Sequence, residues 1–207
     1  MLRMNDSEIR TNLHQKVLRK HHVHSDTLVI DELGLQHGAF RADIVVVKGH
    51  LAGIEIKSDE DTLSRLDDQV AAYDAVFDRS TAVVGARHVE AVIDRLPEWW
   101  GVMLARRGTR GAVRFSSVRR AGTNKGVDAF SVAQLLWHTE AAGILSEMGA
   151  PGSLLRQPRA VLYGELVEAL PIRDLRRRVR DCLRGRADWR HPSRPSRYGG
   201  SFRPTAK

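Results

Sequence analysis

Apolar residues follow two spacings along the chain, and the change from one to the other predicts an α/β fold. Residues 5–20 carry apolar side chains three and four positions apart, which is typical of an amphipathic helix that Asn5, Asp6 or Ser7 could cap. Short runs rich in valine and isoleucine predict strands instead. The expected strands are 27–33, 41–48, 51–57 and 80–85, followed by an edge hairpin of 102–105 and 112–118.

Helical spacing returns after the third expected strand. Ser58 and Asp61 resemble a capping box, and the apolar positions that follow predict a helix to about Phe77. Another helix is expected at 88–96. The chain therefore predicts a core at 1–118 with the order helix, three strands, helix, strand around a mixed central sheet.

The second half of the chain has a different pattern. Residues 119–126 lack periodicity and are predicted to be a linker. Helical patterns at 129–148, 163–170 and 172–183 predict a helical accessory module at 127–190. The composition of 191–207, rich in proline, serine, arginine and glycine, predicts a disordered basic tail.

Composition and charge narrow the class of protein. The single cysteine, Cys182, excludes an internal disulfide and a cysteine-based zinc site, and it suits a reducing compartment. No apolar run is long enough to cross a bilayer, so we expect a soluble, cytoplasmic protein without a membrane partner. The formal net charge of +8 favours a polyanionic partner, of which nucleic acid is the commonest.

The most informative polar residues lie on the second and third expected strands. Gly49 and His50 form a plausible two-residue turn between these strands, so Asp43 can lie near Glu55 with Lys57 beside them. Two carboxylates and an amine beside apolar strands are costly unless they are paired or bind a metal. Magnesium accepts one or two carboxylates, whereas the alternative is an ordinary surface ion pair.

A family resemblance rests on these residues and their context. Asp on the second strand and Glu55-Ile56-Lys57 on the third resemble the PD-(D/E)XK, or restriction-endonuclease-like, nuclease superfamily. The stretch 55–69, with the signature EIKSDxDTLxRLxxQ, is similar more narrowly to a largely uncharacterised bacterial family within it. Ala42 stands where the superfamily's name has proline, but that position is variable there.

The resemblance implies metal-dependent hydrolysis of DNA phosphodiester bonds. Asp43, Glu55 and the backbone carbonyl of Ile56 would bind Mg²⁺ or Mn²⁺, and Lys57 would be the catalytic lysine. Many members carry a further acid, and Glu32 or Glu8 could fill that place. The competing hypothesis is a catalytically silent protein of the same fold that binds DNA or a partner protein.

Supporting residues are expected around this centre. Gln69 and Tyr73 share a helix face, and their spacing resembles the Gln-xxx-Tyr element of RecB-type nucleases, which lies beside the active site. The alternative is that Tyr73 is core and Gln69 is exposed. Arg65, one turn earlier, could contact phosphate or pair with Asp61.

The last expected helix is rich in arginine. Arg173, Arg176, Arg177 and Arg180 are the candidate contacts to a nucleic-acid backbone, although a solvated charged face is the usual meaning of such a run. The expected partner is DNA. RNA and a homodimer stay open.

Overall fold

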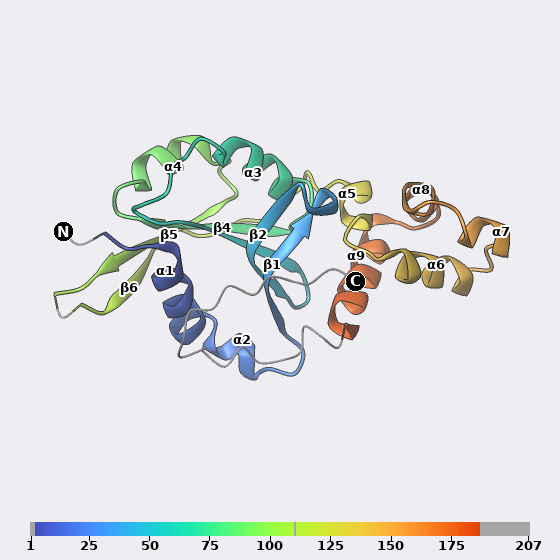
Figure 1. Ribbon diagram of the computed structural model, residues 1–207, viewed down its shortest axis with the longest axis horizontal. Coiled ribbons are helices and arrows are strands. Elements are labelled where there is room, and N and C mark those ends of the chain that lie inside the picture. Colours follow the sequence, from blue (N-terminus) through green and yellow to red (C-terminus); the bar gives the residue numbers. More distant parts are fainter. Residues whose placement is uncertain (1–2, 110, 187–207) are drawn as a thin grey trace, which may run out of the picture.

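The structure is a computed structural model that describes residues 3–109 and 111–186. Six strands form one mixed sheet in the order β1-β2-β3-β4-β5-β6, and helices cover both of its faces (Figure 1). The predicted α/β class is confirmed. The sheet comprises β1 (Leu28–Leu35), β2 (Phe40–Val47), β3 (Leu51–Lys57), β4 (Arg79–Gly85), β5 (Gly101–Arg107) and β6 (Val113–Arg119).

Strand direction follows the length of each connection. The short turns between β1, β2 and β3, and between β5 and β6, give antiparallel pairs. The crossovers through α3 (Leu66–Asp74) and α4 (Val89–Arg95) make β3, β4 and β5 parallel. β5 is therefore an interior strand, and only β6 is the edge of the predicted edge hairpin.

Two apolar clusters hold the layers together. The larger cluster joins one face of the sheet to α3, α4 and the helices that follow β6. The smaller cluster joins the other face to the N-terminal helices, with Ile9 and Leu13 fully buried. In Figure 1, α3 and α4 lie above the sheet and α1 and α2 below it.

The N-terminal helical segment departs from the single helix expected at 5–20. It consists of α1 (Asp6–Asn12), a π-helical turn (Leu13–Val17) and α2 (Arg19–Val23). Asn5 is the cap, since its side chain accepts the Glu8 N–H. The wide turn is consistent with tertiary burial, because Leu13 and Leu18 both pack under the sheet.

The capping-box prediction placed the start of the next helix too early. The Asp61 carboxylate does accept the Ser58 N–H, at 2.7 Å, but α3 begins only at Leu66. His88 contacts the Asp61 carbonyl at 3.0 Å, and this contact holds the segment as a loop. A local capping pattern was thus satisfied without a helix following it.

Residues 119–126 are not a free linker. Asn124 is buried, and its side-chain amide donates to the carbonyls of Asp74 and Phe77 at 2.7 and 2.9 Å. Its backbone N–H donates to the Asp78 carbonyl. One polar side chain therefore fixes this aperiodic segment to the end of α3, a contact that periodicity cannot indicate.

The C-terminal helices are α5 (Ala129–Ala133), α6 (His138–Glu147), α7 (Gly152–Leu155), α8 (Arg159–Ala169) and α9 (Ile172–Gly185). The helix expected at 129–148 is broken, because Glu140 accepts the Trp137 N–H and starts α6 there. Tyr163 also donates to the Leu136 carbonyl. The expected tail at 191–207 lies outside the described residues.

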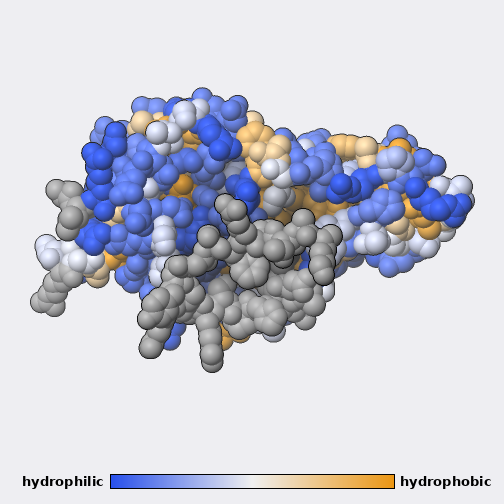
Figure 2. Space-filling view, viewed as in Figure 1, coloured by the Kyte–Doolittle hydropathy of each residue, from blue (hydrophilic) through white to orange (hydrophobic). Residues whose placement is uncertain are grey.

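Most of these helices form an extension beside the sheet, and α9 runs back toward it (Figure 1). Figure 2 shows a largely hydrophilic surface over the sheet layers and apolar side chains where the extension meets them. Within the described part of the chain, no helix has the length and apolar character needed to cross a membrane.

Candidate functional site

Asp43 occupies the point where β2 and β3 separate. The two strands pair from Ile44 and Ile54 to Val47 and Leu51, and beyond Ile44 the regular pairing ends. There the Asp43 carboxylate accepts the Ile56 N–H at 2.7 Å. The Asp43 side chain thus accepts a backbone N–H beyond the paired region of β2 and β3. This hydrogen bond fixes the carboxylate between the two strands.

Glu55 lies on the face of β3 that α3 covers. Lys57 Nζ is 2.7 Å from Glu55 Oε1 and 2.7 Å from Gln69 Oε1, and the Gln69 amide also donates to Glu55. The Tyr73 hydroxyl donates to Glu55 Oε2 at 2.6 Å. Alternation along β3 placed Glu55 and Lys57 on one face, and helical spacing placed Gln69 and Tyr73 above them.

The Tyr73 hydroxyl links the Glu55 carboxylate to the backbone of Asp43. It accepts the Asp43 N–H at 3.2 Å while it donates to Glu55. The ring packs tightly on β3 because residue 53 is glycine: a Cβ there would lie 2.9 Å from Tyr73 Cδ1 and 2.6 Å from Phe77 Cδ2. The structure therefore brings together all five residues that were expected to form one centre.

Sequence reasoning missed Arg10, which supplies the positive charge beside Asp43. Its guanidinium donates to the Asp43 carbonyl at 2.7 Å and to Asp43 Oδ1 at 3.0 Å, and it lies 3.0 Å from Glu32 Oε1. The signal in the sequence was Asp6, four residues earlier, which also pairs with Arg10. That spacing marks one helix face but does not show that the face meets β2.

The two candidates for a further acid lie in different places. Glu32 reaches Arg10 from β1, where its backbone has a φ of 59°, in the left-handed region. Glu8 points elsewhere and pairs with Arg107 at 2.6 Å. Glu32 thus joins the cluster of Arg10, Asp43, Glu55, Lys57, Gln69 and Tyr73, here called the carboxylate cluster, and Glu8 does not.

Burial raises the pKa of three groups in this cluster. It raises the pKa of the Asp43 carboxyl, although the Ile56 N–H and Arg10 favour the charged form. Burial and the charge of Asp43 raise the pKa of Glu55 against the effect of Lys57. The pKa of Tyr73 lies well above its usual value for the same reason. The two carboxylates therefore repel each other inside a desolvated site.

Asp43 and Glu55 are the residues that could hold a divalent cation. Each carboxylate oxygen already accepts a hydrogen bond from Arg10, the Ile56 N–H, Lys57 with Gln69, or Tyr73. Among the described residues, no group of three or more His, Cys, Asp or Glu side chains is arranged to hold a metal ion. Binding of Mg²⁺ or Mn²⁺ here, and a role for the Ile56 carbonyl, stay predictions.

A second polar site lies between α9 and the β2–β3 turn. We call it the arginine cleft. It has a volume of about 340 Å³. Its lining residues are Gly49, His50, Asp78, Arg79, Thr123, Ile172, Arg173, Arg176 and Arg180.

The packing of α9 explains which arginines reach the cleft. Leu175, Val179 and Leu183 are spaced four apart and buried, so the remaining faces of the helix carry the charges. Arg176 lies 3.0 Å from Asp78, whose other oxygen accepts the Leu51 N–H at 2.7 Å. The carboxylate of Asp78 is thus shared between α9 and β3.

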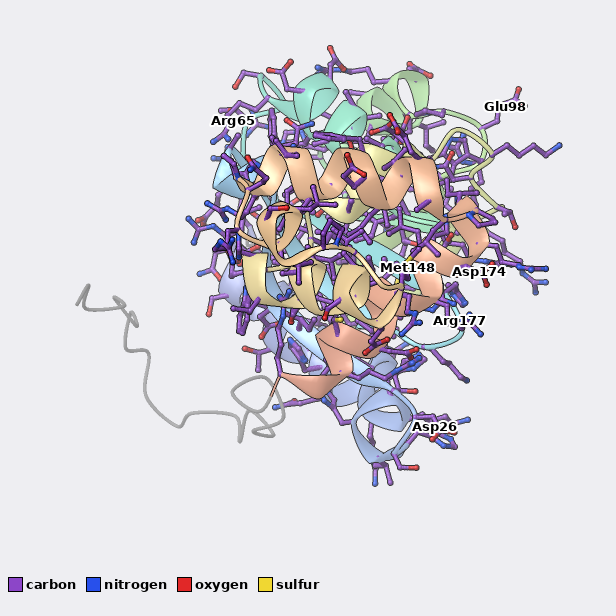
Figure 3. All side chains as sticks on the ribbon, turned by 90° about the vertical axis from the view of Figure 1, so that its right-hand side faces the viewer. Asp26, Arg65, Glu98, Met148, Asp174 and Arg177 are labelled. Carbon is purple, nitrogen blue, oxygen red and sulfur yellow. The ribbon has the colours of Figure 1, made fainter. Side chains whose placement is uncertain are left out.

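Not all of the predicted backbone contacts belong to this cleft. Arg173, Arg176 and Arg180 line it and Arg177 does not. Asp174 pairs with Arg177 at 3.1 Å and with Arg173 at 3.7 Å. Figure 3 shows Arg177 next to Asp174 and Arg65 on a separate part of the surface. The sequence did not indicate Arg79 or His50 as part of this cleft. Only folding brings the β2–β3 turn and the start of β4 beside α9.

The charge of the arginine cleft is not balanced by its own carboxylate. Among the described residues, Arg180 forms no ion pair. Burial lowers its pKa, and Arg184 and Arg176 lower it as well, against the negative charges of Asp78 and Asp181. The pKa of His50 is lowered by burial and by the positive charges of Arg79, Arg180 and Lys48, against the negative charge of Asp78. Four arginines thus line the cleft with one carboxylate, Asp78, and an anion would relieve this excess of positive charge.

Comparison with known proteins identifies relatives of a different kind from those expected. The family model described as Bacteriophage P4 protein cII matches residues 2–193. Protein cII of Enterobacteria phage P4 is 28% identical over 125 residues, which cover 60% of this chain and 47% of that protein. The match thus spans about half the length of that relative. No solved structure matches the chain.

These findings correct the sequence analysis. The PD-(D/E)XK resemblance and the bacterial family within it were wrong, because the matching family is that of a phage protein and is not described as a nuclease. The prediction of a Mg²⁺-dependent deoxyribonuclease, which rested on that resemblance, was wrong for the same reason. A short motif of two acids and a lysine was satisfied by a structural network that does not by itself define a reaction.

Proposed function

The chain belongs to the bacteriophage P4 protein cII family, and from this premise we propose that it acts as a nucleic-acid-binding, regulatory protein. Its target is DNA, bound through the phosphate backbone at the arginine cleft. In this proposal the protein binds the nucleic acid and does not cleave it. The observation that carries the proposal is the convergence of Arg79, Arg173, Arg176 and Arg180 on one cleft.

The cleft offers donors that suit a phosphate. Guanidinium groups form charge-assisted, often paired hydrogen bonds to phosphate oxygens. Arg173 is 88% exposed and Arg176 is 23% exposed, so one could reach outward while the other lies at the wall. Arg176 Nε is buried and has no hydrogen-bond partner. A buried donor without a partner costs free energy unless a ligand or a water molecule accepts its hydrogen bond.

The N-terminus of α9 adds to the attraction. α9 has 14 residues and begins at Ile172, and both Ile172 and Arg173 line the cleft. Backbone N–H groups in the first turn of a helix lack helical acceptors, and the helix dipole places partial positive charge there. The Asp174 and Leu175 N–H groups already donate to the Pro171 carbonyl, so the backbone donors open to a phosphate would be those of Ile172 and Arg173.

The arginine cleft can contact only the phosphate backbone of DNA, and such contacts do not distinguish one base sequence from another. The proposal therefore concerns affinity, and any sequence preference would come from groups outside the cleft. It does not depend on the carboxylate cluster. The restriction-endonuclease-like arrangement of the core stays a prediction about architecture alone.

The test is fluorescence anisotropy with labelled duplex DNA, single-stranded DNA and RNA of one sequence at fixed salt. Arg180→Gln removes a cleft charge that has no ion-pair partner among the described residues, so it should leave folding intact. Arg178→Gln is the matched control, because Arg178 lies on the same helix but pairs with Glu147 at 2.6 Å.

We expect Arg180→Gln to weaken duplex binding about tenfold, the loss of one charge-assisted contact. Arg178→Gln should change it less than about twofold. Absence of binding by the wild type, or equal losses in both variants, would contradict the proposal. Tighter binding of RNA than of duplex DNA would show that RNA, and not DNA, is the preferred partner. Sedimentation velocity on the same samples measures whether a homodimer forms.

A further inference from the structure

A second basic pocket lies at the opposite end of the parallel strands. β3, β4 and β5 end at Lys57, Gly85 and Arg107, and the pocket lies beside these carboxyl ends. Ligands of open α/β sheets bind outside the carboxyl ends of the strands. The residues that line it are Arg3, Met4, Asp59, Ala86, Arg87, Ala105, Arg106 and Arg107.

The start of the described chain forms one wall of this pocket. The Met4 N–H donates to Asp59 Oδ2 at 3.1 Å, and the Asp59 N–H donates to the Met4 carbonyl at 3.1 Å. The Met4 side chain is buried in the cluster under the sheet. These contacts place Arg3 at the pocket, and Figure 1 shows the described segment before α1 on the β5–β6 side of the molecule.

Asp59 is the one carboxylate among the described lining residues, and backbone groups already engage it. Its Oδ1 accepts the Arg87 N–H at 3.2 Å, and its Oδ2 accepts the Met4 N–H. It also lies directly against β4, since a Cβ on Gly85 would be 2.3 Å from Oδ1. Four arginines thus line the pocket with a single carboxylate, and both oxygens of that carboxylate already accept backbone N–H groups.

Two of the arginines are held in place and still have donors to offer. Arg107 pairs with Glu8 at 2.6 Å through one terminal nitrogen, but its Nε is buried without a hydrogen-bond partner. Arg87 donates from one terminal nitrogen to the Asp59 carbonyl at 3.3 Å. Both guanidinium groups are thus oriented by the protein before any ligand binds, which lowers the entropic cost of binding.

We propose that this pocket binds the dianionic phosphate of a small molecule, either free phosphate or a small phosphate ester. Its volume of about 190 Å³ lies below the roughly 300–1,000 Å³ of pockets that take drug-sized ligands. Met4, Ala86 and Ala105 give it apolar surface, against which an ester's carbon atoms would pack. Arginine forks match the geometry of phosphate oxygens and favour a doubly charged group.

This phosphate site is separate from the arginine cleft. The cleft includes Asp78 and Arg79, at the amino end of β4, whereas the phosphate site adjoins the carboxyl end of that strand. Seven residues of extended strand span about 20 Å. Binding of small phosphates therefore does not require that the chain bind DNA.

The experiment is a titration of the full chain with inorganic phosphate and with glycerol phosphate, followed by ¹H–¹⁵N NMR at constant ionic strength set with chloride. We expect saturable shifts of the Ala86, Arg87 and Ala105 amides. Arg107→Gln should weaken the apparent affinity at least about tenfold, because one guanidinium contact is lost. The tighter of the two probes identifies the source of the phosphate.

Glu8→Gln is the matched control, because it removes the charge of the same pair but keeps the arginine and an amide oxygen that can accept its hydrogen bond. We expect the affinity to stay within about twofold. Arg180→Gln should leave these shifts unchanged while it weakens DNA binding. If Arg107→Gln gives a poorly dispersed spectrum, Arg87→Gln at an exposed position takes its place. Absence of saturable shifts, or equal weakening by Glu8→Gln and Arg107→Gln, overturns the proposal.

Discussion

The guanidinium of Arg10 lies 3.0 Å from the Asp43 carboxylate and joins the first helix to the second strand. Both side chains are only 19% exposed. Arg10 also contacts Glu32 at 3.0 Å, so one cation serves two acids that come from β1 and β2. This contact gives the Asp43 carboxylate a cationic partner from the chain itself, on an oxygen that a divalent cation would otherwise contact.

Loss of Arg10 should destabilise the protein. Arg10→Gln leaves the mostly buried Asp43 carboxylate without its cation, and we expect a loss of about 2–3 kcal/mol in the free energy of unfolding. Urea denaturation measures it. Arg41→Gln is the control, because Arg41 lies 3.6 Å from Glu32 and is 65% exposed, so its loss should cost less than about 0.5 kcal/mol. Similar losses in both variants would show that Arg10 has no special role.

The raised pKa of Glu55 predicts a pH effect with a defined sign. Because burial and Asp43 raise the pKa in the folded state above the ordinary 4.5, the native state binds more protons than the unfolded state above that pH. Stability from this group is therefore lost as the pH rises from about 4.5 through the raised value. Glu55→Gln removes the titration, so its free energy of unfolding should fall less steeply over this range.

The difference in slope between wild type and Glu55→Gln can reach about 1.4 kcal/mol per pH unit. Urea denaturation at several pH values from 4 to 8 measures it. Glu60→Gln, an exposed carboxylate on the loop after β3, should leave the slope of the wild type unchanged. A steeper fall in Glu55→Gln than in the wild type would reverse the sign and refute the assignment.

The Tyr73 hydroxyl should contribute beyond its ring. Tyr73→Phe keeps the packing on Gly53 but removes the group that joins the Asp43 N–H to Glu55, and we expect a loss of about 1–3 kcal/mol. A double-mutant cycle with Glu55→Gln should give coupling of about 1 kcal/mol or more, since the two side chains are in contact. Additive effects would mean that the hydroxyl acts independently of Glu55.

DNA binding should depend on salt in proportion to the phosphates contacted. Each contact that is removed lowers the slope of log affinity against log salt by about 0.9 for duplex DNA. The double variant Arg176→Gln/Arg180→Gln should therefore lose up to about 1.8 units of slope. Anisotropy titrations at four or more salt concentrations give the slope. The pair Arg177→Gln/Arg178→Gln removes the same charge outside the cleft and should retain most of the slope.

A divalent cation at Asp43 and Glu55 would have to compete with Arg10. We therefore expect Mn²⁺ to stabilise Arg10→Gln more than the wild type, because the variant leaves the Asp43 carboxylate oxygen that Arg10 occupies open. Thermal unfolding with and without Mn²⁺, and calorimetric titration, measure the difference. Asp43→Asn in the same background should abolish it. An equal response of all three proteins would place Mn²⁺ binding elsewhere.

Local patterns of apolar and polar residues were enough to predict the strands and the sides on which their residues lie. Alternation along residues 51–57 separated Glu55 and Lys57 from Ile54 and Ile56, and the observed β3 has those bounds. Helical spacing set Gln69 and Tyr73 on one face, and the spacing of Leu175, Val179 and Leu183 set the buried side of α9. These properties are local, because backbone geometry fixes them before any long-range contact forms.

Tertiary structure decided which charges meet. Arg10 reaches Asp43 across 33 positions, and Arg176 reaches Asp78 only because α9 packs back on the β2–β3 turn. Neither contact has a periodic signature, and each depends on the packing of whole elements. The motif of Asp43, Glu55 and Lys57 could therefore be located from sequence, but its meaning could not: the neighbours that neutralise it come from distant segments.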